Sequence, residues 1–321
     1  MTGKLKIAMY WGAGCGGCEV ALLDTDMTLL ELGEVADIVL CPLAVDGKYA
    51  DIEAMNDQAI DVTFFNGAVR NSETEHVARL LRAKSKILIA FGACACLGGI
   101  PGLANQFPTE ELLERVYETT ETTLNETHVR PDPHGHTPEG PVEIPVLYNR
   151  VLPLDETVEV DYYLPGCPPT SNWIRKVIEA IIDGKLPAKG SVIGLDRTVC
   201  DECPRIRTGE RSIAKLHRPH EIVPDPARCL LEQGIVCCGP GTRGGCSARC
   251  TAVNMPCRGC YGPPAGVVDQ GAKILSAVSS HIAADEEDEI EKILAPLVDA
   301  IGTFCPFSVP KSLLQQSRRA S

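Results

Sequence analysis

The sequence lacks the features of several familiar protein classes. No stretch approaches the roughly 18 consecutive apolar residues that a membrane-spanning helix needs. The opening residues contain neither a secretory signal sequence nor a twin-arginine leader. Basic residues are too few to balance the acidic ones, and the formal net charge is −13. We therefore expect a cytoplasmic protein with no membrane span and no nucleic-acid partner, because phosphate binding draws on clustered basic side chains.

Cysteine, by contrast, is abundant, with 16 residues in a chain of 321. A small secreted protein would use so many thiols as a disulfide framework. This chain has a mass of 34.5 kDa and 44% apolar residues, so it can bury ordinary cores in about two domains. Because cytoplasmic thiols stay reduced, we interpret these cysteines as ligands or catalysts.

The first part of the chain, residues 1–188, alternates short apolar runs with amphipathic stretches. This pattern predicts an α/β domain with a parallel sheet covered on both faces by helices. The predicted strands are Lys4–Tyr10, Asp37–Leu40, Ile60–Phe65, Lys86–Phe91 and Val160–Leu164. The predicted helices are Glu19–Gly33, Ser72–Ala83 and Thr170–Asp183, with Ser72 and Thr170 as N-caps and Gly33 and Gly184 as stops.

Four cysteines come soon after predicted strands: Cys15 and Cys18 after the first, Cys94 after the fourth and Cys167 after the fifth. The carboxyl ends of parallel strands line one edge of an open sheet, so we expect these thiols to converge there on one ligand. Neighbouring glycines would let backbone amides approach a bulky anionic cofactor. The pattern Gly12-x-Gly14-x-x-Gly17 also matches a dinucleotide fingerprint, but a cysteine interrupts it and no acidic residue ends the second strand.

From residue 189 to residue 321 proline, glycine and cysteine are dense. This composition predicts an irregular cysteine-rich domain, closed by helices at Gly271–Ala284 and Asp285–Ile301. Thiols recur at intervals short enough for one loop to wrap an inorganic centre. The closest pairs are Cys200-x2-Cys203, Cys246-x3-Cys250 and Cys257-x2-Cys260.

Residues 108–141 are polar and end in a run rich in proline and glycine, which predicts an insertion on the surface of the sheet domain. His128, His134 and His136 in this segment could bind a metal ion. Histidines in a proline-rich loop are, however, more often simply solvated.

Four motifs occur together and in order along the chain. They are Cys15-Gly-Gly-Cys18-Glu19, Gly92-Ala-Cys94-Ala-Cys96-Leu-Gly98-Gly99, Pro165-Gly-Cys167-Pro-Pro169 and Pro256-Cys257-Arg-Gly-Cys260. Nearly end to end, the chain resembles the small subunit of NiFe hydrogenases. It is most similar to the cytoplasmic methyl-viologen-reducing type, which does not reduce the deazaflavin coenzyme and which partners heterodisulfide reductase in methanogens.

The resemblance implies a flavodoxin-like sheet domain and an oxidoreductase subunit without a catalytic centre of its own. Electrons from H2 oxidation at a nickel-containing large subunit would pass through three 4Fe-4S clusters to a downstream iron–sulfur or flavin partner, such as heterodisulfide reductase. The implied proximal ligands are Cys15, Cys18, Cys94 and Cys167. The implied medial ligands are Cys246, Cys250, Cys257 and Cys260, and the implied distal ligands are Cys200, Cys203, Cys229 and Cys237.

Two of these positions depart from the periplasmic members of the family. Cys200 stands where they have histidine, and Cys250 stands where they have proline. A thiolate at Cys200 changes the charge of the distal cluster and should lower its reduction potential. A fourth thiolate at Cys250 permits a complete medial 4Fe-4S cluster. The resemblance therefore implies three low-potential clusters, suited to a strongly reducing cytoplasmic acceptor.

Four cysteines are left without a ligand role: Cys41, Cys96, Cys238 and Cys305. We expect them to be buried as small apolar side chains. Cys238 could nevertheless replace its neighbour Cys237 as a distal ligand, and Cys96 could less readily replace Cys94. Glu19 could relay protons, contact the large subunit, pair with a nearby base or act as a first-turn carboxylate of a helix.

Two other functions compete with an electron relay. A zinc-stabilised interaction protein could hold two structural zinc ions with the cysteines from Cys200 to Cys260, but this leaves the four thiols at the strand ends without a role. A quinone-linked subunit of a respiratory complex would share the sheet domain. Such a subunit normally lacks the eight-cysteine region that follows here.

Overall fold

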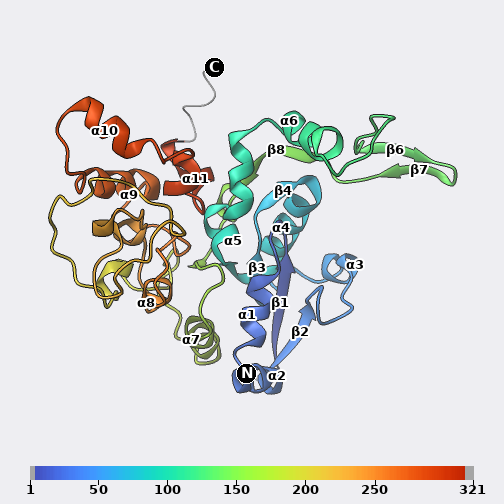
Figure 1. Cartoon of the computed structure of the whole chain (residues 1–321). Helices are drawn as coiled ribbons and strands as arrows, with labels where there is room; N and C mark the ends of the chain where they lie inside the picture. Colours follow the sequence, from blue (N-terminus) through green and yellow to red (C-terminus); the bar gives the residue numbers. More distant parts are fainter. Residues whose placement is uncertain (1–3, 315–321) are drawn as a thin grey trace.

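A five-stranded parallel sheet forms the centre of the first part of the chain (Figure 1). The computed structural model describes residues 4–314. The strands of this sheet are β1 (Leu5–Trp11), β2 (Ala36–Leu40), β3 (Ile60–Asn66), β5 (Ser85–Phe91) and β9 (Tyr162–Leu164). Their order is β2-β1-β3-β5-β9, which is the flavodoxin-like order. The predicted fold class is confirmed, and each predicted strand overlaps an observed one.

Two apolar layers cover the sheet because successive strand residues point to opposite faces. On one face, Ile7 and Met9 of β1 pack in a core with α1 (Gly17–Leu23), α2 (Met27–Val35) and α7 (Ser171–Ile182). On the other face, Ala8 and Tyr10 pack in a core with α4 (Ser72–Lys84) and α5 (Ala93–Leu97). The short helix α3 (Tyr49–Glu53) adds Ile52 to the second core.

The helix predicted over Glu19–Gly33 is wrong in one respect, because the chain forms α1 and α2 with a break between them. Asp26 has a φ of 52°, which an α-helix cannot continue through. Just before it, the Thr25 hydroxyl donates to the Leu22 carbonyl at 2.7 Å and competes for a helical acceptor. Gly33 is not a stop either, since α2 runs on to Val35.

The helix caps agree with prediction only in part. Thr170 is the N-cap of α7, as expected, and Gly184 follows the helix with a φ of 64°. The N-cap of α4 is Asn71 rather than Ser72: the Asn71 side chain accepts from the Thr74 amide at 2.8 Å. The Ser72 hydroxyl instead accepts from the Val146 amide at 3.0 Å.

The cysteine-rich part has its own core, which runs in sequence from Val199 to Phe304. Loops and short helices enclose it: α8 (Arg249–Ala252), α9 (Gln270–Ser279), α10 (Glu287–Leu294) and α11 (Ala300–Phe304). The single helix predicted over Asp285–Ile301 is therefore two helices. Pro296 cannot continue α10, and the Asp299 side chain caps α11 by accepting from the Gly302 amide at 3.0 Å. The helix predicted over Gly271–Ala284 ends earlier, at Ser279.

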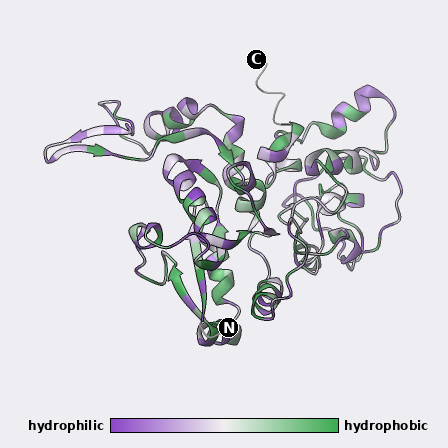
Figure 2. Cartoon of the chain, turned by 180° about the vertical axis from the view of Figure 1, so that it is seen from behind, coloured by the Kyte–Doolittle hydropathy of each residue, from purple (hydrophilic) through white to green (hydrophobic). Residues whose placement is uncertain are grey.

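The polar segment predicted as an insertion forms an arm on the opposite side of the sheet from α9, α10 and α11 (Figure 1). Its base is an antiparallel pair of β4 (Val69–Asn71) and β8 (Leu147–Leu152). The arm itself contains α6 (Thr109–Glu114), a π-helical turn η2 (Arg115–Thr119) and a hairpin of β6 (His134–Thr137) and β7 (Gly140–Glu143). From behind, the same arm and the largely hydrophilic α10 stand at the two ends of the molecule (Figure 2).

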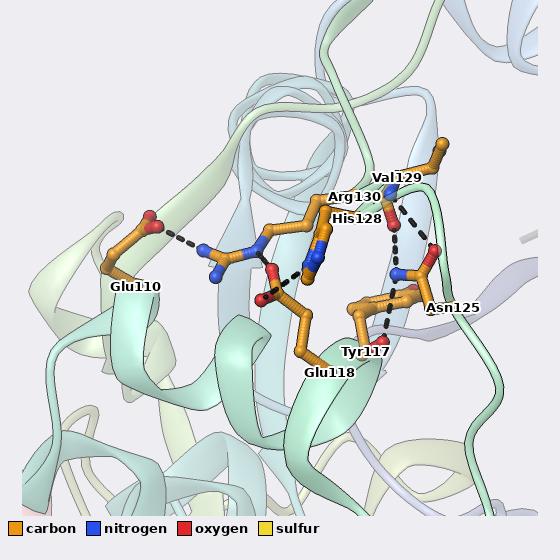
Figure 3. A network of polar contacts seen from close by, with 7 residues as sticks. All are labelled: Glu110, Tyr117, Glu118, Asn125, His128, Val129 and Arg130. Atoms are coloured by element: carbon orange, nitrogen blue, oxygen red, sulfur yellow. Dashed lines mark hydrogen bonds and ion pairs between the residues drawn. The ribbon is translucent and has the colours of Figure 1, made fainter.

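A polar network within this arm joins α6 and η2 to the segment around Arg130 (Figure 3). Arg130 pairs with both Glu110 and Glu118, and His128 lies beside Glu118 with 3.3 Å between Nδ1 and Oε2. His134 and His136 are exposed on β6. The three histidines thus lie on the surface.

Within residues 4–314, no helix is both long and apolar enough to cross a membrane.

Candidate cofactor sites

The four proximal cysteines are brought together at the carboxyl edge of the sheet. Cys15 follows β1, Cys18 is the second residue of α1, Cys94 lies on α5 and Cys167 follows β9. Burial raises the pKa of Cys94 to about 12, and the nearby thiols of Cys167 and Cys15 add to this rise. Burial also raises the pKa of Cys18 well above its usual value, with contributions from Glu19, Cys94 and Cys167. Each of the four thiols is therefore within electrostatic reach of at least two of the others.

Glycines keep space clear around these sulfurs. A Cβ on Gly92 would lie 2.3 Å from the Cys18 sulfur, and one on Gly99 would lie 2.5 Å from the Cys94 sulfur. Gly92 has a φ of 88°, which also favours glycine. Its amide donates to the Leu164 carbonyl at 2.8 Å, so the turn that leads to Cys94 is joined to the strand that leads to Cys167.

The four distal cysteines line one cavity of about 460 Å³. Burial raises the pKa of Cys200 to about 12; the neighbouring thiol of Cys237 adds to the rise and Arg207 opposes it. Cys229 is positioned by its amide, which donates to the Ile206 carbonyl at 2.8 Å. The Ile206 amide also donates to the Ala227 carbonyl at 2.8 Å, so residues 227–229 run alongside Ile206.

Cys237 and Cys238 point in different directions. Cys237 lines the distal cavity, and the amide of Cys257 donates to its sulfur at 3.3 Å. The Cys238 sulfur instead lies 3.5 Å from the Thr303 carbonyl of α11, and its side chain is buried. This geometry supports Cys237 as the ligand and a packing role for Cys238.

The other cysteines that were not predicted as ligands are also buried in packed surroundings. The Cys96 thiol donates to the Ala90 carbonyl at 3.2 Å, inside the core that covers one face of the sheet. Cys305 is fully buried and its thiol donates to the Ile301 carbonyl at 3.3 Å. Cys41 belongs to the core on the other face of the sheet.

The four medial cysteines line a second cavity of about 390 Å³, together with Cys167. Burial raises the pKa of Cys260 to about 12, while a hydrogen bond from the Cys167 backbone acts against this rise. Burial also raises the pKa of Cys257 well above its usual value, and the thiols of Cys237 and Cys238 contribute. Cys250, by contrast, is exposed.

Contacts between cysteines place the three groups in series. Cys167 of the proximal group lines the same cavity as Cys260 of the medial group. The Cys257 amide of the medial group donates to the Cys237 sulfur of the distal group at 3.3 Å. The medial group therefore lies between the other two.

The chemistry of these groups fits iron–sulfur clusters. Each group offers four thiols, and burial opposes the ionisation of most of them, so four thiolates together need a strongly cationic centre to bind. Within residues 4–314, no three His, Cys, Asp or Glu side chains converge on a single-ion site. The medial and distal thiols instead surround cavities of several hundred Å³, which gives room for a polynuclear cluster held by cysteine.

Glu19 is buried, with 5% of its surface exposed. Both of its carboxylate oxygens accept from the side-chain amide of Asn66, at 2.6 and 2.7 Å. Among the described residues its partner is thus an amide at the end of β3 rather than the base considered from sequence. The only sequence signal for Asn66 is a polar residue that ends a buried strand.

Sequence reasoning also missed Arg205, which lines the distal cavity together with the four cysteines. Its side chain is 5% exposed. The available signal was a basic residue two positions after Cys203.

Comparison with known proteins agrees with this geometry. The family model described as the NADH ubiquinone oxidoreductase 20 kDa subunit matches residues 15–181. The chain is 45% identical to the iron-sulfur subunit of the F420-non-reducing hydrogenase of Archaeoglobus profundus, over 88% of this chain and 89% of that one. It is 37% identical to the corresponding F420-non-reducing hydrogenase subunit of Methanothermobacter marburgensis, over 98% and 97% of the two chains.

Solved structures show the same similarity. A chain of an NAD+-reducing NiFe-hydrogenase in the H2-reduced state is 36% identical, with a TM-score of 0.50 over 57% of this chain and 94% of that one. A NiFeSe hydrogenase from Desulfovibrio vulgaris Hildenborough has a TM-score of 0.52 over 83% and 96% of the two chains. At 16% identity, the second match supports the fold alone.

Proposed function

The chain belongs to the hydrogenase small-subunit family, and from this we propose that it relays electrons through three 4Fe-4S clusters in a NiFe hydrogenase. The observation that carries the proposal is the series of three four-cysteine groups, in which Cys167 also lines the medial cavity and the Cys257 amide donates to the Cys237 sulfur. The zinc-stabilised alternative would leave this series without a purpose.

The proposed ligands follow the three groups. Cys15, Cys18, Cys94 and Cys167 hold the proximal cluster, and Cys246, Cys250, Cys257 and Cys260 hold the medial one. Cys200, Cys203, Cys229 and Cys237 hold the distal one. We also propose that the chain divides into a flavodoxin-like domain of residues 1–188 and a cysteine-rich domain of residues 189–321.

The protein's own part in the relay is to hold the clusters in place and to shield them from water. Each cluster, when bound, accepts and passes on one electron. The cysteine loops fix the order of the three sites, while the buried positions of Cys18, Cys237 and Cys257 keep water away from much of each site. Amide hydrogen bonds to cysteine sulfur, such as Cys257 to Cys237, stabilise negative charge on the ligands.

A nickel-containing large subunit is the proposed electron donor. The helix α1, which begins two residues after the exposed Cys15, and the helix α2 that follows it present an apolar face made of Val20, Leu23, Met27 and Leu30, with exposed fractions between 56% and 64%. Apolar side chains exposed together commonly mark a protein interface. We propose that this apolar face of α1 and α2 packs against the large subunit.

The proposed acceptor is a cytoplasmic iron–sulfur or flavin protein, such as heterodisulfide reductase. Support comes from the similarity to F420-non-reducing hydrogenase subunits of methanogens. Their name excludes F420 as the acceptor in those proteins, and the same is proposed here.

Anaerobic purification followed by metal analysis tests the proposal. Three clusters require about twelve irons and about twelve acid-labile sulfides per chain, because each cluster contributes four of each. Zinc should be near background, and nickel should co-purify with a second polypeptide. Two tightly held zinc ions with little iron would instead support the zinc-stabilised interaction protein.

A further inference from the structure

Arg205 is a permanently charged side chain enclosed between cysteine loops. It follows Cys203 by two residues, is 5% exposed and lines the cavity shared by the four distal cysteines. Burying a guanidinium is strongly unfavourable unless hydrogen bonds and an opposite charge compensate it. Its partners therefore indicate what the charge is for.

Every hydrogen-bond acceptor of Arg205 is neutral. Nε donates to the Thr251 carbonyl at 3.0 Å, and Nη1 donates to the carbonyls of Asp225 and Arg228 at 2.8 and 2.9 Å. Nη2 donates to the side-chain oxygen of Asn254 at 2.6 Å. Among residues 4–314 no carboxylate forms an ion pair with Arg205. Its hydrogen-bond donors therefore have acceptors, but its positive charge is not paired with a negative side chain.

These acceptors flank ligands of two different clusters. Arg228 directly precedes Cys229 of the distal group, and Thr251 directly follows Cys250 of the medial group. The Thr251 hydroxyl also lies 3.2 Å from the Cys203 thiol. One guanidinium thus ties together the loops of Cys203, Cys229 and Cys250.

Resting on the proposed function, we propose that Arg205 is a positioning residue that braces the distal and medial ligand loops and whose positive charge favours the reduced distal cluster. A cluster with four thiolates carries net negative charge, and reduction adds one more. A nearby cation stabilises the reduced form more than the oxidised form. Losing the cation should therefore lower the reduction potential.

Two substitutions separate the charge from the brace. Arg205→Met keeps an apolar stem but removes both the charge and the hydrogen bonds. Arg205→Lys keeps the charge, but one ammonium with three donors cannot reproduce a planar fork of five. Arg207→Met is the matched comparison, because Arg207 lines the same cavity and opposes the rise in the pKa of Cys200 but has half of its side chain exposed, so water screens its charge more strongly than that of Arg205.

The measurement is an anaerobic redox titration of the holo complex followed by EPR, with iron analysis of each variant. The distal signal is identified beforehand as the one altered by Cys200→Ser. At the midpoint potential of the parent's distal cluster, the ratio of reduced to oxidised distal cluster in Arg205→Met should be about tenfold lower than in the parent. This corresponds to a midpoint potential that is lower by about 59 mV for a one-electron step. The proximal signal should not move, and Arg207→Met should shift the distal signal less.

Arg205→Lys should restore most of the distal potential but should lose distal and medial iron faster than the parent when exposed to oxidant. An Arg205→Met variant with full iron and an unchanged distal potential would overturn the role of the charge. An Arg205→Lys variant that loses iron no faster than the parent would overturn the brace. If the parent itself holds zinc and little iron, the proposed function fails, which is a distinguishable result.

Discussion

Single side chains decide how closely water approaches each cysteine group. Cys257 and Cys237 are buried, whereas Cys250, in the same group as Cys257, is exposed. An iron held by the exposed thiolate would be the one that oxidants and solvent reach most easily. We therefore expect an iron bound by Cys250 to be the one that the medial cluster loses most easily.

We expect Cys250→Pro to convert the medial cluster into a three-iron cluster. Iron should fall from about twelve to about eleven per chain, since one iron loses its protein ligand. An EPR signal of an oxidised three-iron cluster should appear, and transfer to the downstream acceptor should slow. Hydrogen activation at the partner's nickel site should persist. Proline is tolerable there because residue 250 lies in the first turn of α8.

Cys250→Ala should give the same signal, whereas Arg249→Ala, which leaves the thiolate in place, should not. If Cys250→Pro retains all its iron and shows no three-iron signal, Cys250 is not the fourth ligand. The medial assignment would then have to include another residue.

At the scale of secondary structure, one carboxylate joins three segments at the edge of the sheet. Asp161 precedes β9 and is 2% exposed; it pairs with Arg82 of α4 at 2.6 Å and with Lys189 at 2.5 Å. It also accepts from the Leu88 amide of β5 at 2.8 Å. Desolvation by burial would raise the pKa of Asp161, but hydrogen bonds from Lys189, Arg82 and Leu88 together lower it.

Asp161→Asn should destabilise the protein by about 2–3 kcal/mol at neutral pH, because it leaves the half-buried Arg82 without its counter-charge. A carboxylate whose pKa is lowered in the folded state stabilises the fold at pH values above its pKa in the unfolded state, about 3.9. This stabilisation is lost as the pH falls through the pKa of the folded state. The difference in the free energy of unfolding between parent and variant should therefore shrink below about pH 4. Chemical denaturation of the anaerobic holoprotein at several pH values measures this difference.

Asp183→Asn is the control, since within residues 4–314 the one ion pair of Asp183 is the exposed pair with Lys185. Its cost should stay below about 1 kcal/mol. Equal costs for the two substitutions would show that Asp161 does not hold these segments together.

At the scale of the whole molecule, the apolar face of α1 and α2 is the proposed contact with the nickel-containing subunit. The double variant Leu23→Glu with Leu30→Glu should reduce co-purifying nickel at least about tenfold, because burying even one unpaired charge costs more than 1.4 kcal/mol. The iron content of the chain should stay near twelve. Nickel analysis of affinity-purified chain measures the loss.

Val298→Glu, at an exposed residue between α10 and α11, should leave nickel unchanged. The loaded chain without nickel should neither take up nor evolve hydrogen, since no nickel site is expected in it. Hydrogen-to-dye activity in the nickel-free chain would contradict the relay assignment. An unchanged amount of co-purifying nickel in the double variant would show that the large subunit binds to a different surface of the chain.

Local sequence pattern determined the sheet and the family of this protein. Strand alternation and apolar runs are properties of neighbouring residues, so the five strands could be read from the chain, and the flavodoxin-like order followed from the family resemblance. The order of the cysteine motifs was enough to identify a hydrogenase small subunit. The grouping of the twelve thiols into three ligand sets stays a prediction.

Only the tertiary structure decided which distant residues meet. Asn66 binds Glu19 across 47 positions, and Arg205 reaches Thr251 across 46. Whether Cys237 or Cys238 faces the distal cavity depends on how its loop packs against α11. No local periodicity encodes such pairs, because hydrogen bonds and the burial of charge depend on the chain elements that surround them in space.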